Sequence, residues 1–407
     1  MENKVRYHRV LVLAVAEGLS AIFGDGQYAD KVVEKLLRKD ARWGARDRAF
    51  IAEQTYNAVR WWRLWWAVAD EKPTYSEAKL VRLVGIQLAA SGATLPDWAE
   101  WSGLTTDWVH GRVTAVSGVR AVQHAIPDWL DEQGLAAFGA DWATEMAALN
   151  RPADVILRAN RLRILATDLA QKLHAEGWET SLIEAAADAL RVVKRGNITA
   201  TTAYKSGLFE VQDAGSQLIA PFLRVEPGMS VVDACSGAGG KSLHLAALMQ
   251  NKGKILALDV ADNKLTILRE RAKRNGATNI ETRHIGSHKT IERLADSADR
   301  LLLDVPCSGL GVLRRNPDAK WKLSPEFLIQ VQATQYDILQ RYSRAVKAEG
   351  MMVYATCSIL PDENQHQVKR FLEAGAPFKL IDEQSITSAK FGFDGFYMAL
   401  LQKKSKG

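Results

Sequence analysis

The sequence predicts an α/β protein in which a doubly wound parallel sheet follows a helical region and a small α+β module. Three observations support this. Short apolar runs alternate with helix-length segments from about residue 225 onward, ten of the twelve tryptophans fall within the first 148 residues, and shorter mixed segments lie between. At 407 residues the chain is too long for one core of ordinary size. We therefore expect three domains, spanning 1–148, 149–208 and 209–407.

The first region is expected to be helical because apolar residues recur at helical spacing in ADKVVEKLLRKD and in RDRAFIAEQTYNAVRWWRLWWAVAD. Turn residues in EKPTYSE, SGATLPD and AIPDW separate the helices. The tryptophans predict a Trp-rich core, with an exposed surface for stacking RNA bases as the alternative. Four arginines form either a basic face or a solvated one: Arg42, Arg46, Arg48 and Arg60.

Strands and helices follow in a regular order. In the middle module we expect a strand and turn in ADVILRANRLRI, a helix in ATDLAQKLHAEG, and short strands in WETSLIE and ALRVVKR. In the third region the expected strands are MSVVDAC, KILALDV, ADRLLLDV and MMVYATCS, and the expected helices are GGKSLHLAALMQ, ADNKLTILRERAKRNG and PEFLIQVQATQYDILQRYSRAVK. Strands separated by helices of this length form a parallel sheet that binds ligands at the strand C-termini.

Composition narrows the class of protein. Hydrophobic content of 47% and charged content of 25% are typical of soluble globular proteins, and no apolar run approaches the ~20 residues that cross a bilayer. We interpret the N-terminal apolar stretch as an amphipathic helix and not a signal peptide. Three cysteines, an odd number, fit a reducing cytoplasm. No metal is expected, because no CxxC spacing occurs and the sequence has only one HxxxH spacing, at His284 and His288. A net charge of +6 and a pI near 9.1 suit a nucleic-acid partner.

The segment VVDACSGAGGKSLHL (231–245) is a strand, a turn of small residues and a helix. Glycines there let the backbone approach a ligand, and N–H groups are free at the start of the helix. A Walker A loop is excluded because Cys235 occupies the position of its first glycine. A dinucleotide fingerprint is excluded because Ser242 occupies the position of its third. The glycine turn of class I methyltransferases remains, with a purely structural turn as the alternative.

Three further strand ends carry candidate side chains. Asp259 ends KILALDV, where a carboxylate can accept hydrogen bonds from ribose hydroxyls or cap the next helix. Cys307 in LLLDVPCSGLG and Cys357 in VYATCSILPDEN each follow an apolar run. A lone buried cysteine is usually a small hydrophobic residue, but two at strand ends beside polar residues favour thiolate chemistry.

Together these motifs resemble the RsmB/NOP/SUN family of RNA cytosine-5 methyltransferases. The resemblance rests on DACSGAGGKS, LLLDVPCSGLGVLRRNPD, YATCSILPDEN and FDGFYMALL, with FEVQDAGSQL ahead of them, and covers about 205–402. The first 145 residues are similar to the NusB-like domain of the ribosomal-RNA members, and the middle module to their RNA-recognition-motif-like insert. The family implies a class I, Rossmann-like methyltransferase fold for the sheet.

The resemblance also implies roles for individual residues. Cys357 would attack carbon 6 of cytosine, Cys307 would help to remove the carbon-5 proton, and Asp304 would lie at the Watson–Crick edge and border the cofactor. S-adenosylmethionine would be held by Cys235, Ser236, Gly237, Ala238, Gly239, Gly240 and Lys241, with Asp259 on its ribose. Cys235 is expected to pack, and Lys241 to balance the methionine carboxylate. The residues alone leave open which cysteine attacks.

Candidate RNA contacts are Arg314 and Arg315, near the flipped base, and Arg158 and Arg161 in the small module. Two departures from the family pattern stand out. Ala238 replaces a common proline, and the segment Ile285, Gly286 and Ser287 replaces an aspartate beside the adenine. Adenine recognition is then expected to rest on backbone groups or on Ser287.

The expected substrate is RNA, specifically 16S ribosomal RNA of the small subunit, and the expected enzyme is a cytoplasmic monomer. Two alternatives stay open. One is a transfer-RNA methyltransferase with the same chemistry. The other is an RNA-binding ribosome-assembly factor with little activity, which the altered 285–287 segment leaves possible.

Overall fold

The computed structural model describes residues 7–405, so the outermost residues of the first and last expected domains, 1–6 and 406–407, lie outside it. The chain divides into two compact units. One contains the residues up to Arg151 together with Leu313–Leu323, and the other contains Pro152–Val312 and the chain from Ser324 onward. The expected boundaries near residues 148 and 208 stay predictions. Nothing in the sequence indicated that a segment following Cys307 belongs with the helical unit.

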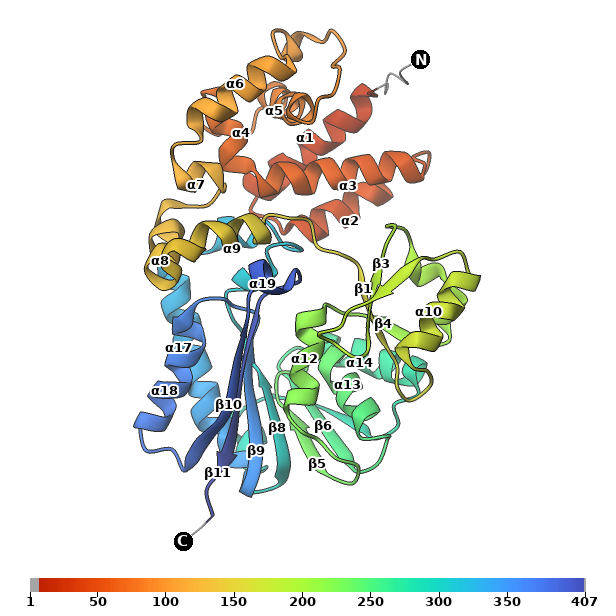
Figure 1. Ribbon diagram of the computed structural model, residues 1–407, viewed down its shortest axis with the longest axis vertical. Coiled ribbons are helices and arrows are strands. Elements are labelled where there is room, and N and C mark those ends of the chain that lie inside the picture. The colour runs from red at the N-terminus through yellow and green to blue at the C-terminus, as the bar shows by residue number, and fades with distance from the viewer. Residues whose placement is uncertain (1–6, 406–407) are drawn as a thin grey trace. The chain divides into compact units, whose positions relative to one another are not determined.

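The first unit is helical, as expected (Figure 1). Its helices are α1 (Arg9–Phe23), α2 (Ala29–Lys39), α3 (Ala45–Arg60), α4 (Trp62–Ala69), α5 (Glu77–Ala90), α6 (Thr106–Val116), α7 (Arg120–Gln123), α8 (Asp128–Phe138) and α9 (Trp142–Leu149). The Trp-rich core is confirmed: Trp62, Trp65, Trp66, Trp101 and Trp142 are buried, and no tryptophan in the described residues is exposed. The other five tryptophans of this region are partly exposed, so base stacking on them stays an open alternative: Trp43, Trp61, Trp98, Trp108 and Trp129.

The long helix expected through RWWRLWW is interrupted. Trp61 leaves the helical conformation with φ −107° and ψ 20°, so that α3 and α4 are separate helices. The break orients Trp62 to stack on Phe23 with ring centroids 3.7 Å apart and to meet Trp66 edge-on at 5.5 Å. Aromatic packing of this kind outweighs the continuity of one helix.

The segment Leu313–Leu323, which contains α16 (Ala319–Lys322), is held by the helical unit through buried contacts. Its backbone carbonyls at Leu313 and Arg314 accept hydrogen bonds from the Arg60 guanidinium, at 3.1 and 2.9 Å. The Trp321 indole donates to the Val59 carbonyl at 2.7 Å. Arg60 is itself buried, so it is not part of an exposed basic face.

The small module is an antiparallel sheet in the order β2-β3-β1-β4. Its elements are β1 (Ile156–Ala159), α10 (Ala166–Ala175), β2 (Thr180–Leu182), β3 (Ala189–Val192), α11 (Thr202–Lys205) and β4 (Phe209–Val211). This βαββαβ succession is the ferredoxin-like arrangement. The expected α+β module is thereby confirmed.

The large sheet has the order β10-β11-β9-β8-β5-β6-β7. Its strands are β5 (Ser230–Asp233), β6 (Lys254–Asp259), β7 (Ile280–His284), β8 (Ala298–Asp304), β9 (Val346–Thr356), β10 (Phe378–Ile386) and β11 (Phe396–Lys403). The strands from β5 to β9 pair in parallel, which confirms the expected architecture, whereas β11 and β10 add antiparallel pairs at one edge. These two antiparallel strands were not among the strands expected from the sequence.

Helices cover both faces of this sheet (Figure 1). On one face lie α12 (Ala214–Phe222) and α13 (Gly240–Leu248), and on the other α15 (His288–Glu292), α17 (Pro325–Tyr342) and α18 (Gln365–Glu373). The remaining helices are α14 (Asp262–Asn275) and α19 (Ser388–Phe391). From β5 the chain moves outward to β7 and then crosses back to β8, so the strand order reverses between β5 and β8. Ligands of doubly wound sheets bind at such a switch point.

No helix between residues 7 and 405 combines the length and the apolar character needed to cross a membrane.

Candidate active site

The glycine turn after β5 uses its glycines for two different reasons. Gly237 and Gly239 both have left-handed backbone angles, with φ of +53° and +85°. A Cβ on Gly239 would lie 2.1 Å from Leu268 Cδ1, so this glycine is required by packing. A Cβ on Gly237 would meet no atom within 4 Å. The open side of the turn is therefore at Gly237, where a ligand could approach the backbone.

Asp259, at the end of β6, is buried and faces this turn. Its carboxylate accepts hydrogen bonds from the Gly237 N–H and the Ala261 N–H, both at 2.8 Å. The helix-capping interpretation is thus realised in part, because Ala261 precedes α14. Two carboxylate oxygens can accept about four hydrogen bonds, so acceptor capacity remains for a ligand hydroxyl.

Asp233, at the end of β5, is a buried carboxyl whose environment the sequence did not reveal. One oxygen accepts a hydrogen bond from Ser242 Oγ at 2.6 Å, while Oδ1 has no partner within the described residues. Burial raises the pKa of Asp233 to about 7, and the charge of Asp304 adds to the rise. An acceptor left without a partner beside an open glycine turn is what a bound polar ligand would complete.

An ion pair spans the switch point. Lys241 Nζ, in the first turn of α13, lies 2.6 Å from Asp304 Oδ2 at the end of β8. Burial by itself lowers the pKa of Lys241, but the adjacent Asp304 carboxylate raises it above its ordinary value. The ammonium is therefore engaged by Asp304, and because it has three N–H donors, its contact with the methionine carboxylate stays a prediction.

The two candidate cysteines meet at the ends of the neighbouring strands β8 and β9. Their Sγ atoms are 3.1 Å apart, and both side chains are partly exposed. The pKa of Cys307 lies well above its ordinary value, first because of its hydrogen bond with Cys357 and then because of burial. The raised pKa disfavours a thiolate on Cys307, and either sulfur could be the donor in the contact between them.

The FDGFYMALL motif closes the back of these loops. The Gly311 N–H donates to the Cys357 carbonyl at 2.9 Å, and the Gly395 N–H donates to the Gly311 carbonyl at 2.7 Å. A Cβ on Gly311 would lie 2.1 Å from the Gly395 oxygen. The two glycines therefore let the loop after β8, the loop after β9 and the start of β11 come together.

Cys235 differs from the other two cysteines. It packs beside the apolar core on the α17 face of the sheet, and burial raises its thiol pKa well above the ordinary value. This environment suits the packing role expected for it and disfavours a thiolate. The Ile285 N–H donates to the Asp259 carbonyl at 2.9 Å, which ties the atypical 285–287 segment to the end of β6.

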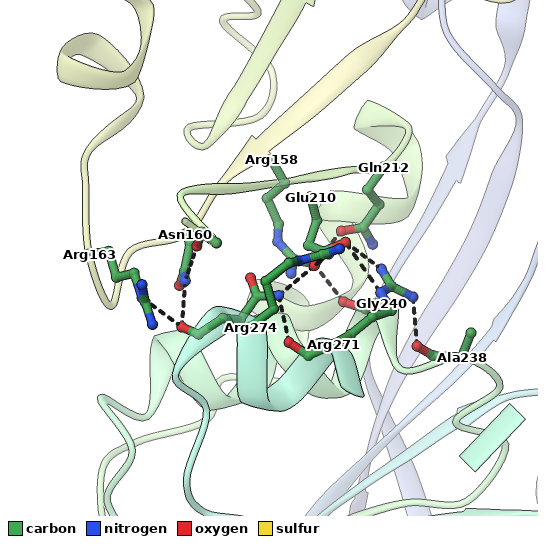
Figure 2. A network of polar contacts seen from close by, with 11 residues as sticks. Arg158, Asn160, Arg163, Glu210, Gln212, Ala238, Gly240, Arg271 and Arg274 are labelled. Atoms are coloured by element: carbon green, nitrogen blue, oxygen red, sulfur yellow. Dashed lines mark hydrogen bonds and ion pairs between the residues drawn. The ribbon is translucent and has the colours of Figure 1, made fainter. Parts of the chain in front are cut away.

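The structure corrects the role expected for Arg158. This side chain is 2% exposed, and its Nη1 donates to the Gly240 carbonyl at 2.5 Å and to the Gln212 amide oxygen (Figure 2). Burial lowers its pKa to about 10. A guanidinium consumed in this way cannot reach an RNA phosphate. Arg161 differs, because it pairs with Asp188 at 2.7 Å and keeps 43% of its side chain exposed.

Arg314 is also corrected. It is buried within the helical unit, where its carbonyl accepts a hydrogen bond from Arg60, so a phosphate contact by its side chain is not supported. Arg315 is partly exposed, and its role as an RNA contact stays a prediction.

Figure 2 shows that the small module braces the glycine turn through one carboxylate, Glu210 of β4. Glu210 accepts hydrogen bonds from Arg271 Nη2 at 2.8 Å, from Asn275 Nδ2 at 2.5 Å and from Arg274. Arg271 Nη1 also donates to the Ala238 carbonyl at 2.6 Å. No local sequence pattern predicts this network, because Glu210 is separated from its partners in α14 by about sixty residues.

Among the residues that the structure describes, no group of three or more histidine, cysteine, aspartate or glutamate side chains could hold a metal ion.

Two family models match the chain. The model for 16S rRNA methyltransferase RsmB/F matches residues 220–402, and that for an RsmF/B-like ferredoxin-like domain matches residues 126–199. A probable ribosomal RNA small subunit methyltransferase B of Bacillus subtilis is 32% identical over 303 residues, which cover 70% of this chain and 68% of that protein. The ribosomal RNA small subunit methyltransferase B of Vibrio vulnificus is 31% identical over 294 residues, covering 70% and 68%.

Solved structures show the same fold. The crystal structure of PH0851 has a TM-score of 0.81 at 22% identity, covering 98% of this chain and 100% of that one. A methyltransferase homologue from Pyrococcus horikoshii has a TM-score of 0.63 at 24% identity, covering 70% and 97%. The Rossmann-like methyltransferase fold is thereby confirmed. By fold and by sequence similarity, the chain belongs to the RsmB/NOP/SUN family of methyltransferases.

Proposed function

We propose that this protein methylates carbon 5 of a cytosine in small-subunit ribosomal RNA, using S-adenosylmethionine and a covalent bond between Cys357 and carbon 6. The observation that carries the proposal is the approach of Cys307 and Cys357 to 3.1 Å, at the ends of adjacent strands. Family membership and the small-subunit ribosomal RNA methyltransferases among the relatives support the substrate class.

The residues present fit the cofactor. The turn is open above Gly237, Asp233 Oδ1 is a buried acceptor without a partner, and Asp259 retains acceptor capacity. Ser236 to Gly240 would hold the methionine part, with Asp259 at the ribose. S-adenosylmethionine, when bound, supplies a methyl group attached to a positively charged sulfur.

The cysteines solve the chemical problem of the substrate. Carbon 5 of cytosine is too weak a nucleophile to accept a methyl group unaided. When the Cys357 thiolate bonds to carbon 6, carbon 5 becomes enamine-like and can attack. Asp304, whose Oδ2 lies 2.6 Å from Lys241 Nζ, would lie at the Watson–Crick edge. There its protonation or hydrogen bonding would favour the negative charge that develops at N3.

Cys307 would then complete the reaction. The first cause of its high pKa is the hydrogen bond with the Cys357 thiol, and that thiol is lost once Cys357 is bonded to carbon. Cys307 could then lose its own proton to solvent and, as a thiolate, take the carbon-5 proton. As the carbon 5–carbon 6 double bond re-forms, the sulfur–carbon 6 bond breaks and Cys357 leaves as a thiolate. Attack by one sulfur therefore activates the other as a base.

The test is transfer of labelled methyl groups to unmodified 16S ribosomal RNA, with 5-methylcytosine mapped by bisulfite sequencing. One newly protected cytosine is expected. Methylation of transfer RNA alone would retain the mechanism and overturn the substrate. Absence of transfer to either RNA would favour the RNA-binding assembly factor.

The roles of the two cysteines are tested by trapping. Cys357→Ala should abolish transfer without forming an adduct, and Cys307→Ala should accumulate enzyme covalently attached to RNA, visible as a shifted band on a denaturing gel. An adduct formed by the Cys357→Ala protein would exchange the two roles.

A further inference from the structure

Beneath the two cysteine loops lies a buried carboxylate that this mechanism does not use. Glu363 ends the short turn Pro361–Glu363, six residues after Cys357, and its exposure is 0%. A buried glutamate is costly unless its oxygens are fully engaged. Its partners therefore indicate what it does.

Both oxygens of Glu363 accept hydrogen bonds from the residues that follow the cysteines. Oε2 accepts from the Ser308 N–H at 2.8 Å, and Oε1 accepts from the Ser308 hydroxyl at 2.5 Å and from the Ser358 hydroxyl. Because Ser308 follows Cys307 and Ser358 follows Cys357, one carboxylate joins the two loops directly beside the sulfurs. The serine hydroxyls are themselves 3.2 Å apart.

The carboxylate is also anchored to the sheet and to α17. The Gln335 amide donates to Glu363 Oε2 at 3.0 Å and to the Pro306 carbonyl at 2.9 Å. The Tyr354 hydroxyl of β9 donates to the Glu363 carbonyl at 2.7 Å. Movement of either cysteine loop would therefore break hydrogen bonds to groups that belong to the rigid fold.

The described partners of Glu363 are all neutral, and it forms no ion pair within residues 7–405. Its charge is thus undiminished by a cation, and it lies close to Cys307, where it is a further cause of the raised pKa after the Cys357 hydrogen bond and burial. A nearby negative charge disfavours a second anion. Ser308, next to Cys307, donates two hydrogen bonds to this carboxylate, whereas Ser358, next to Cys357, donates one.

We propose that Glu363 is a positioning residue that makes the two cysteines unequal: it fixes the spacing of the sulfurs and places its negative charge beside the Cys307 loop, so that Cys357 is the more reactive thiol. The catalytic consequence rests on the proposed function. The inequality of the thiols does not, because it is a property of the protein without RNA or cofactor.

The experiment measures alkylation of each cysteine by iodoacetamide in the native protein between pH 6.5 and 9, with peptide mass spectrometry to separate Cys235, Cys307 and Cys357. In the wild type, Cys357 should react on the order of tenfold faster than Cys307, since one unit of pKa changes the thiolate fraction about tenfold. Glu363→Gln keeps the shape of the side chain and removes its charge. In this variant the ratio of the Cys357 to the Cys307 alkylation rate should fall below about threefold. The pH at which Cys307 begins to react should also decrease.

Asp362→Asn is the matched control, because Asp362 lies in the same turn but is exposed and pairs with His366. It should leave the ratio unchanged. A ratio unaltered in folded Glu363→Gln would overturn the proposal. If Glu363→Gln does not fold, Ser358→Ala replaces it. This change keeps the charge of Glu363 but removes the hydrogen bond that holds the Cys357 loop, so the ratio of alkylation rates should also fall. An unchanged ratio would again overturn the proposal. If the wild-type protein shows the expected ratio of Cys357 to Cys307 alkylation rates but transfers no methyl group to RNA, only the proposed function is contradicted.

Discussion

Two buried glutamates brace the two sides of the site, and they are surrounded by opposite kinds of partner. Glu210, 3% exposed, supports the glycine turn and accepts hydrogen bonds from Arg271, Arg274 and Asn275. Glu363, completely buried, supports the cysteine loops. Within residues 7–405, the donors to its carboxylate are a backbone N–H, two hydroxyls and an amide.

The difference follows from what each glutamate has to hold. At the turn, arginines can serve both the carboxylate and the backbone, as Arg271 does with Glu210 and the Ala238 carbonyl. Burial tends to raise the pKa of Glu210, but the arginines lower it below its ordinary value. The contact between the small module and α14 is therefore stabilised by ion pairs. Beside the thiols, a cation would stabilise a thiolate on either sulfur. Neutral donors satisfy the hydrogen-bonding capacity of Glu363 without stabilising a thiolate.

The comparison predicts that removing Glu210 costs the most stability. Glu210→Ala leaves two partly buried guanidinium groups without their carboxylate, which should lower the free energy of unfolding by about 3 kcal/mol. Urea denaturation measures this, with Arg341→Ala as control, since its exposed pair with Asp337 should contribute less than about 0.5 kcal/mol. Equal losses of unfolding free energy in Glu210→Ala and Arg341→Ala would show that the buried pairs of Glu210 stabilise the protein no more than an exposed pair does.

The seam between the small module and α13 should also be sensitive to acid. His244 Nε2 lies 3.3 Å from Asp188 Oδ2, with Arg158 and Arg161 as the other nearby charges, and burial lowers its pKa to about 4. Because the ordinary value is about 6.5, the unfolded chain binds this proton first. Stability should therefore fall by up to about 3 kcal/mol as the pH decreases from 6.5 towards 4.

The measurement is the free energy of unfolding across that range for the wild type and for His244→Gln. The variant should show a flatter dependence on pH. A variant curve parallel to that of the wild type would assign the acid sensitivity to other groups.

Substitutions at Gly239 and Gly237 should affect different properties of the glycine turn, the first mainly stability and the second mainly ligand binding. Gly239→Ala should cost roughly 2 kcal/mol, because the new Cβ collides with Leu268 and the left-handed φ is strained. Gly237→Ala should cost only about 1 kcal/mol of strain, since its Cβ enters open space. It should nevertheless weaken binding of S-adenosylmethionine at least tenfold by calorimetry. Undiminished binding by Gly237→Ala would move the cofactor away from this turn.

The smallest stability effect is expected at Arg161. Its pair with Asp188 is partly exposed, so Arg161→Ala should cost less than about 1 kcal/mol. If Arg161 contacts RNA, the Arg161→Ala protein should bind 16S ribosomal RNA more weakly. The slope of log affinity against log salt concentration should then decrease by the amount of about one phosphate contact. Arg158→Ala is the counterpart, expected to destabilise the seam first. A loss of RNA affinity without destabilisation in Arg158→Ala would reverse the correction made for that residue.

The sequence by itself determined the features encoded by neighbouring residues. Strands followed by small or polar residues predicted β5, β6, β8 and β9, and with them the placing of Asp259, Cys307 and Cys357 at strand ends. These predictions succeed because hydrophobic period and turn chemistry act over a few residues. The same reasoning excluded a Walker A loop by a single residue, Cys235.

Only the tertiary structure decided which polar side chains are buried and with whom. Arg158 and Arg314 were expected on the surface, as arginines usually are, yet packing buries both. Glu363 meets Ser308 across 55 residues and Glu210 meets Arg271 across 61. A buried charge is stable only when its partners arrive together, and partners so distant in sequence come together only in the folded chain.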